Sequence, residues 1–281
     1  MLETTGRSKN MVLEKIKGRN GLKLDLKDLD TPIDEARYLV FDTELTGLKL
    51  KKDSIVSIGA VKMAGGRIDV GDAYYRLVAP ETDLTGQSVV IHGITPSEVS
   101  RCPNIDTVLP EFLDFCKDRI IVGHFVSIDL GFINKEMMRL YGSPMKSPAA
   151  DTFIIYQWLR QSEEDACAYH ESKQEDISLS ALADKYDIPV SSAHNALDDA
   201  FVMARIFQRF ISILPEFGVR NLKDLLRIGK PLKSKVSSAH NALDDAFVMA
   251  RIFQRFISIL PEFGVRNLKA LLRIGKPLKS K

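Results

Sequence analysis

The chain has few cysteines and no long apolar run. Its 281 residues include only three cysteines, Cys102, Cys116 and Cys167, without the close pairs typical of zinc sites, so neither a disulfide framework nor a structural zinc site is expected. No apolar run is long enough to cross a membrane, and the opening residues MLETTGRSKN lack the apolar core of a signal peptide. These absences predict a reducing, cytoplasmic setting and no membrane partner.

Net charge is also small, at +2, but it is unevenly distributed. Residues 1–189 carry a net charge of −7, whereas residues 190–235 and 236–281 carry +4 and +5. A basic end of this kind can lie against phosphate groups. Ordinary solvated helix faces explain the same charges equally well.

The sequence contains one internal repeat. Residues 236–281 repeat residues 190–235 with a single difference, Asp224 against Ala270. Two copies are too few for a solenoid, so the repeat indicates a late duplication. The chain is therefore expected to have three parts: an extension outside the main core (1–35), a domain with a C-terminal helical segment (36–235) and the duplicate (236–281).

Between the extension and the duplicate, the apolar pattern predicts an α/β fold with a mixed sheet. Three β-type runs come first, with a hairpin turn at Gly65-Gly66, and strands then alternate with helices. Strands are expected at 37–44, 53–63, 68–78 and 119–124, and helices at 106–118, 128–142, 152–161, 178–186 and 196–214. Pro110 is expected to mark the true start of the helix at 106–118, and Thr95 to cap a short helix before it. Residues 162–176 are expected to form a solvated loop.

Two carboxylates lie close together on the first predicted strand. Asp42 and Glu44 are two residues apart, so their side chains leave the same face of the sheet. Two like charges on an apolar strand are unfavourable unless a cation neutralises them, although an exposed acidic strand edge is the simpler alternative. Asp129 follows the strand at 119–124 and opens a helix, where an aspartate can simply be an N-cap.

A further aspartate lies on the long helix of the first repeat copy. Asp199 falls on the apolar face of this helix, together with Met203, and there it needs a cation or a hydrogen-bond partner. Its neighbour Asp198 is explained as the capping partner of Asn195. His194, in the loop before the helix, becomes a candidate general base if these carboxylates hold a metal ion.

Four carboxylates without a cysteine or histidine cluster favour a hard cation, Mg²⁺ or Mn²⁺, over zinc. Two such ions can activate water and stabilise the leaving oxygen of a phosphodiester.

These segments together resemble the DEDDh 3′–5′ exonucleases, the group that includes the proofreading epsilon subunit of bacterial DNA polymerase III. FDTELTG contains Asp42 and Glu44, IVGHFVSIDLGFIN contains Asp129, and HNALDDAFVMARIF contains His194 and Asp199. The three segments stand in the family order. The loop IHGITPSEV also looks like its counterpart in epsilon-type members, and the resemblance covers roughly residues 36–213.

The resemblance implies a ribonuclease-H-like fold, in which helices flank a mixed five-stranded sheet. It implies two Mg²⁺ (or Mn²⁺) ions on the four carboxylates, with His194 deprotonating the water that attacks the 3′ end of DNA. The products would be nucleoside 5′-monophosphates, and a DNA polymerase would be a possible partner. The pocket for the terminal nucleotide would be lined by Leu45, Thr46, His92 and Ile128.

Two departures from the family pattern affect the second motif. Phe125 replaces the usual asparagine and Ile128 the usual phenylalanine, which affects base stacking and sugar contact rather than the metal ligands. Asp151 matches a commonly acidic position with an expected structural role. Two alternatives stay open: a ribonuclease trimming RNA 3′ ends, and a non-catalytic module that binds nucleic acid or a polymerase, blocked by the duplicated segment.

Only one repeat copy can complete one active site. His240 and Asp245 repeat the local sequence of His194 and Asp199, but they follow the preceding helix after about 54 residues instead of about 8, a loop-closure disadvantage of about 1.7 kcal/mol. The first copy is therefore expected to occupy the site. The second copy is expected to be an appended segment that can exchange between chains, with the oligomeric state left open.

Overall fold

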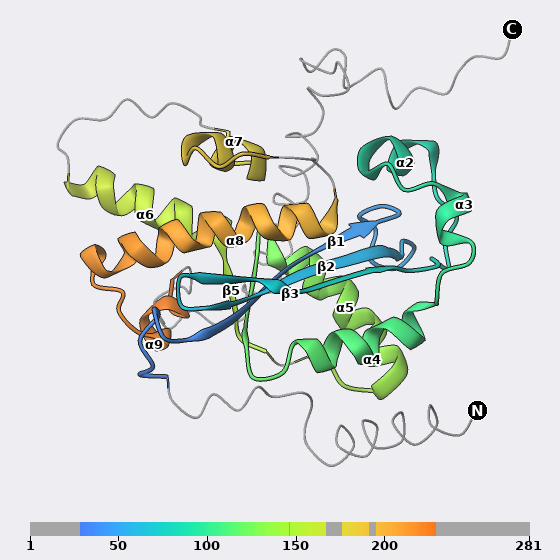
Figure 1. Cartoon of the computed structure of the whole chain (residues 1–281), viewed down its shortest axis with the longest axis horizontal. Coiled ribbons are helices and arrows are strands. Elements are labelled where there is room, and N and C mark those ends of the chain that lie inside the picture. The colour runs from blue at the N-terminus through green and yellow to red at the C-terminus, as the bar shows by residue number, and fades with distance from the viewer. Residues whose placement is uncertain (1–28, 146, 167–175, 191–194, 229–281) are drawn as a thin grey trace, which may run out of the picture. The chain divides into compact units, whose positions relative to one another are not determined.

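The computed structural model describes residues 29–145, 147–166, 176–190 and 195–228 (Figure 1). The chain divides into two units, Met1–Leu232 and Lys233–Lys281, and every described residue belongs to the first. No helix among the described residues is long and apolar enough to cross a membrane.

A mixed five-stranded sheet with the order β3-β2-β1-β4-β5 forms the centre of the first unit. Central β1 pairs antiparallel with β2 and parallel with β4. The four predicted strands are confirmed within two residues at their ends, whereas β5 is too short to show a pattern in the sequence. The strands are β1 Arg37–Leu45, β2 Ile55–Ala64, β3 Arg67–Leu77, β4 Ile120–Gly123 and β5 Ala149–Asp151.

Helices cover both faces of this sheet (Figure 1). On one face α8 (Ala196–Ile213) crosses β1 and β2, and its Phe207 packs edge-on against Tyr38 with ring centroids 4.9 Å apart. On the other face α4 (Ile105–Phe115) places Phe112 5.3 Å from the ring of Phe41. Even-numbered residues of β1 therefore face α8, and odd-numbered residues face α4 and α5 (Val126–Tyr141).

The remaining helices are shorter or lie at the margins of the sheet. The short helix after Thr95 is confirmed with a capping box from Glu98, and Gly142 ends α5 in the left-handed conformation. The helix before Thr95 was not predicted from the sequence. The further elements are α2 Gly86–His92, α3 Pro96–Val99, α6 Thr152–Ala166, α7 Leu179–Lys185, η1 Leu214–Phe217 and α9 Leu222–Leu225.

Two predicted element boundaries are wrong, and so is the prediction that the whole extension lies outside the core. Pro110 lies inside α4 rather than at its start, because the side chain of Asn104 caps the helix by accepting the N–H of Thr107. Residues 162–166 continue α6 instead of beginning a loop. The described end of the extension belongs to the core: Ile33 is 1% exposed, and its N–H donates to the carbonyl of Arg220.

Candidate functional site

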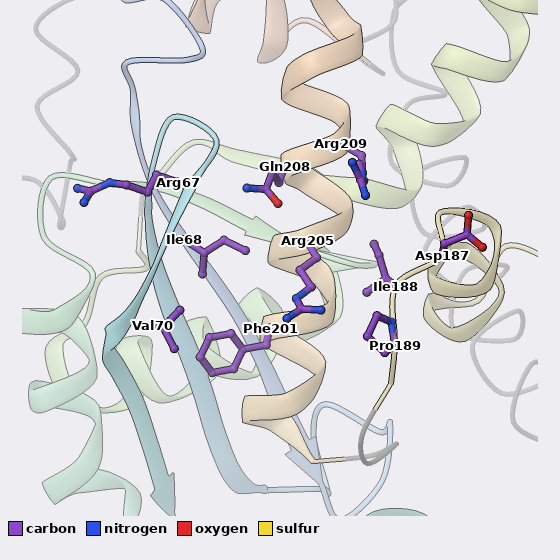
Figure 2. A pocket seen from close by; sticks show the side chains of 10 residues that line it. All are labelled: Arg67, Ile68, Val70, Asp187, Ile188, Pro189, Phe201, Arg205, Gln208 and Arg209. Atoms are coloured by element: carbon purple, nitrogen blue, oxygen red, sulfur yellow. The ribbon is translucent and has the colours of Figure 1, made fainter.

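A hollow of about 490 Å³ lies over the outer surface of α8 (Figure 2). Three arginines, Arg67, Arg205 and Arg209, line it together with apolar groups such as Val70 and Phe201. None of the predicted catalytic or pocket residues that the structure describes lines this hollow. This hollow is therefore not the predicted active site, and the predicted carboxylates lie elsewhere.

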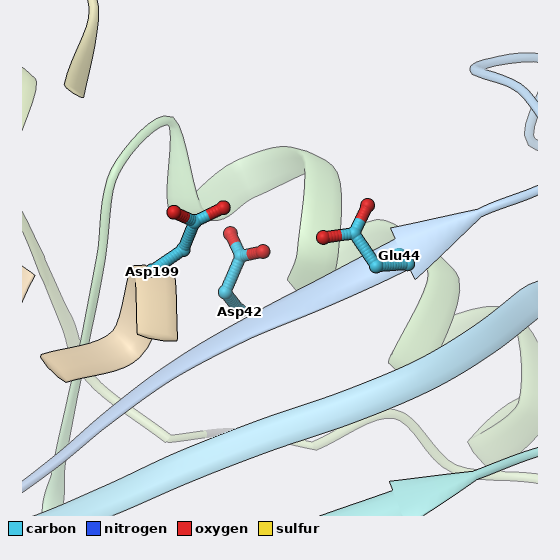
Figure 3. Close-up of side chains that lie close together, drawn as sticks. All are labelled: Asp42, Glu44 and Asp199. Atoms are coloured by element: carbon cyan, nitrogen blue, oxygen red, sulfur yellow. The ribbon is translucent and has the colours of Figure 1, made fainter. Parts of the chain in front are cut away.

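The predicted carboxylates of β1 and α8 meet at the site. One carboxylate oxygen from each of Asp42, Glu44 and Asp199 lies within 4.8 Å of the others (Figure 3). Asp42 and Glu44 point from β1 toward the first turn of α8, as their two-residue spacing predicts. This group could hold a metal ion, and its all-oxygen donor set suits Mg²⁺ or Mn²⁺.

A glycine allows α8 to approach the strands closely enough for this meeting. Gly59 on β2 is the register partner of Asp42. A Cβ atom at Gly59 would lie 2.2 Å from backbone atoms of Ala196 and Leu197, far inside van der Waals contact. Only glycine therefore lets the first turn of α8 rest on the sheet beside Asp42.

The N-terminus of α8 is fixed by its cap, and a tyrosine lies beside it. The side-chain oxygen of Asn195 accepts the N–H groups of Leu197 and Asp198, which confirms Asn195 as the N-cap. The side chains of Asn195 and Ser57 lie near the Tyr75 hydroxyl. Burial raises the pKa of Tyr75 above its ordinary value, and the nearby charge of Glu44 also raises it. Tyr75 therefore lies at the rim of the site, and no local sequence pattern indicated it.

Asp129 reaches the same segment of β1 from the side. It is fully buried in the first turn of α5, and its Oδ1 accepts the N–H of Thr43 at 3.2 Å and the Thr43 hydroxyl at 2.6 Å. The cap position of α5 is Phe125, so the alternative of Asp129 as an N-cap is wrong. β4 pairs with β1 only as far as Val40, which leaves the N–H of Thr43 for the aspartate. Asp129 thus binds the residue between Asp42 and Glu44.

Thr43 is expected to position Asp129 for metal binding. Thr43→Val keeps the shape of the side chain and removes the hydroxyl donor, so we expect divalent-metal affinity to fall roughly tenfold to a hundredfold, as for other supporting contacts of metal ligands. Calorimetric titration with Mn²⁺ measures this change. Thr43→Ser keeps the donor and is the matched control, and equal affinities for the valine and serine variants would contradict the role.

Burial of these acids creates a need for positive charge. Asp42, Glu44 and Asp129 are 4%, 7% and 0% exposed. Ionised carboxylates gathered in a buried place repel one another, and a bound divalent cation offsets this repulsion. The site's residues therefore fit a divalent metal.

All four residues predicted to line a nucleotide pocket are buried, namely Leu45, Thr46, His92 and Ile128. Leu45 ends β1 and Thr46 follows it, and the Thr46 hydroxyl accepts the N–H of Ser54 at 3.0 Å. His92 ends α2, where its Nδ1 accepts the N–H of Ile94 at 3.0 Å. A neutral His92 with this bond carries its proton on Nε2. Their contact with a nucleotide stays a prediction.

Phe125, which replaces the usual asparagine of the family, lies at the turn between β4 and α5. Phe125 has φ 55°, a left-handed conformation that asparagine tolerates better than phenylalanine does. The Asp151 carboxylate accepts the N–H groups of Phe125 and Val126, each at 3.1 Å, and Phe125 also packs 4.4 Å from the ring of Phe153. Asp151 therefore holds the turn between β4 and α5, which agrees with its expected structural role.

Several predicted residues lie outside the described part of the chain. They are His194 of the first copy, and His240 and Asp245 of the second. Their proposed roles rest on the sequence.

Comparison with known proteins relates this arrangement to nucleases. Residues 39–207 match the family model described as exonuclease (RNase_T). Over 199 residues the chain is 32% identical to the PolC-type DNA polymerase III of Thermotoga maritima, an alignment that covers 71% of this chain and only 14% of the polymerase.

Two solved structures share the fold. E. coli exonuclease I in complex with a dT13 oligonucleotide has a TM-score of 0.57 and 17% identity, covering 65% of this chain and 42% of that one. The nuclease domain of 3′hExo, a DEDDh family member bound to rAMP, has a TM-score of 0.52 and 18% identity, covering 65% and 93%. The mixed sheet flanked by helices is thus a ribonuclease-H-like exonuclease fold.

Proposed function

The chain belongs to the exonuclease family, and we propose that it is a metal-dependent 3′–5′ exonuclease that hydrolyses DNA and releases nucleoside 5′-monophosphates. The meeting of Asp42, Glu44 and Asp199 within 4.8 Å carries this proposal. Asp129 supplies the fourth carboxylate through its place beside Thr43. Metal binding explains the convergence of these acidic side chains better than a purely structural role does.

The proposed roles follow the chemistry of each side chain. Asp42, Glu44, Asp129 and Asp199 would bind two Mg²⁺ or Mn²⁺ ions, which supply charge stabilisation for the phosphodiester during hydrolysis. His194 would accept the proton of the attacking water, because an imidazole with a reference pKa near neutrality suits that task.

Residues next to the carboxylates would bind the terminal nucleotide. Leu45 and Thr46 follow Glu44 directly, and Ile128 precedes Asp129, so these three side chains come from the same segments as the metal ligands. Leu45 and Ile128 offer apolar surface to a base, and His92 offers a ring nitrogen to a polar group. The 3′ end would then lie at the carboxylates.

A labelled-substrate assay tests the proposed function. Single-stranded DNA and RNA of one sequence, each labelled at the 3′ end, are incubated with the chain in Mg²⁺ and in excess EDTA. We expect labelled mononucleotide from DNA in Mg²⁺ and none in EDTA. A lack of metal-dependent mononucleotide release would contradict the proposal, and faster release from RNA would assign the enzyme to RNA 3′ ends.

A DNA polymerase is the proposed working partner. The PolC-type relatives contain the matching region within a much longer DNA polymerase, since the alignment covers 14% of that protein. A further arm of the assay adds the replicative polymerase of the same organism. A changed rate of mononucleotide release would support the partnership, and an unchanged rate would contradict it.

A further inference from the structure

The first repeat copy fills a socket formed by the rest of the described chain. Its helix α8 packs Phe207 against Tyr38 and Phe210 against Tyr186, with ring centroids 4.9 and 5.7 Å apart. The same copy continues through η1 to α9, where the N–H of Leu222 donates to the carbonyl of Thr31 at 3.0 Å. The copy therefore docks along its described length, 195–228, and not only through α8.

The second copy offers the same docking surface. Residues 236–281 repeat 190–235 at every position except Ala270, which stands where Asp224 does. Asp224 is half-buried, and the hydrogen bond at this position runs from its backbone N–H to the side chain of Asn221, which alanine keeps. No other side chain that docks the first copy differs in the second.

We propose that residues 236–281 exchange with residues 190–235 for this one socket, within a single chain. Because the docking residues are the same, the two states differ mainly in loop closure. The connection from α7 to the docked helix is 186–195 in the first state and 186–241 in the second. Loop closure over these lengths favours the first copy roughly tenfold to twentyfold, so the second copy is a minor occupant.

The active site would stay complete in the exchanged state. With the second copy docked, Asp245 and His240 take the places of Asp199 and His194. This consequence rests on the proposed function, whereas the exchange itself does not. Tests of folding and of activity therefore separate the two.

Folding tests the exchange without reference to activity. Phe207 is fully buried, so Phe207→Asp removes the first copy from the socket, and Phe253→Asp is the matched change in the second copy. In the full chain we expect Phe207→Asp to lower the melting temperature by roughly 5 °C and the double variant by more than roughly 10 °C. A Phe207→Asp variant that melts as low as the double variant would overturn the exchange.

Activity provides the second test, on 3′-labelled single-stranded DNA in Mg²⁺. Asp199→Asn is expected to keep roughly a tenth of the wild-type rate, because Asp245 serves the minor state. Asp199→Asn with Asp245→Asn is expected to lose at least a further factor of roughly a hundred. Equal rates for the single and double variants would overturn the exchange while leaving the proposed function intact. An inactive wild-type chain would defeat the proposed function, and the melting test would then decide the exchange alone.

Concentration distinguishes exchange within a chain from exchange between chains. The rate per molecule of Asp199→Asn should be constant as protein concentration rises from the nanomolar to the micromolar range. A rate per molecule that increases with concentration would overturn the exchange within one chain and assign the docking to a second copy of the protein.

Discussion

Asp42→Asn is expected to reduce the rate of mononucleotide release by on the order of 10⁴-fold, because a ligand of the metal ions loses its charge. Asparagine has the same shape as aspartate, so the packing of β1 beside Gly59 is retained. Asp42 also lies outside the repeated unit, so no second copy can replace it. Rates on labelled DNA, with calorimetric titration of Mn²⁺, measure the effect.

The same substitution should have the opposite effect on stability when metal is absent. Asp42 is 4% exposed and close to two other carboxylates, so removing its charge relieves repulsion. In EDTA the melting temperature of Asp42→Asn is therefore expected to be higher than that of the wild type. Asp69→Asn, an exposed carboxylate on β3, is the control and should change neither quantity. A rate within tenfold of wild type for Asp42→Asn would contradict the metal site.

Local sequence patterns were sufficient to predict most elements and the carboxylates that β1 and α8 bring to the site. The two-residue spacing of Asp42 and Glu44 and the helical position of Asp199 are properties of single elements, so the sequence could orient these side chains. Periodicity failed where an element is too short to show it, as in β5, or where a cap overrides a proline, as at Asn104. Such local competition is not visible in a pattern of apolar residues.

Contacts between elements were not predictable in this way. Gly59 leaves room for α8, and its position beside Asp42 follows from the pairing of β1 with β2. Thr43 is hydrogen-bonded to Asp129, which lies 86 residues away in the chain. Tyr75 and Asn195, which are likewise far apart in the sequence, lie near each other. These residues support the site through tertiary packing, so a sequence without the fold gives no reason to choose them.

The general base gives the second large effect, and the repeat determines how it must be measured. Changing His194 and His240 to alanine together is expected to slow mononucleotide release by roughly 10² to 10⁴-fold, the usual contribution of a general base. The purified variants are compared on labelled DNA, with melting temperatures as the control for folding. An unchanged rate in the double variant would exclude both histidines as the base.

The single variants divide this effect between the copies. His194→Ala alone should slow the reaction by about tenfold if the second copy can enter the socket, and by the full amount if it cannot. His240→Ala alone should lower the rate by no more than roughly a tenth, because the second copy is the minor occupant. A loss of activity confined to His240→Ala would reverse the assignment and make residues 236–281 the working copy. The same four proteins therefore identify the base and show which copy supplies it.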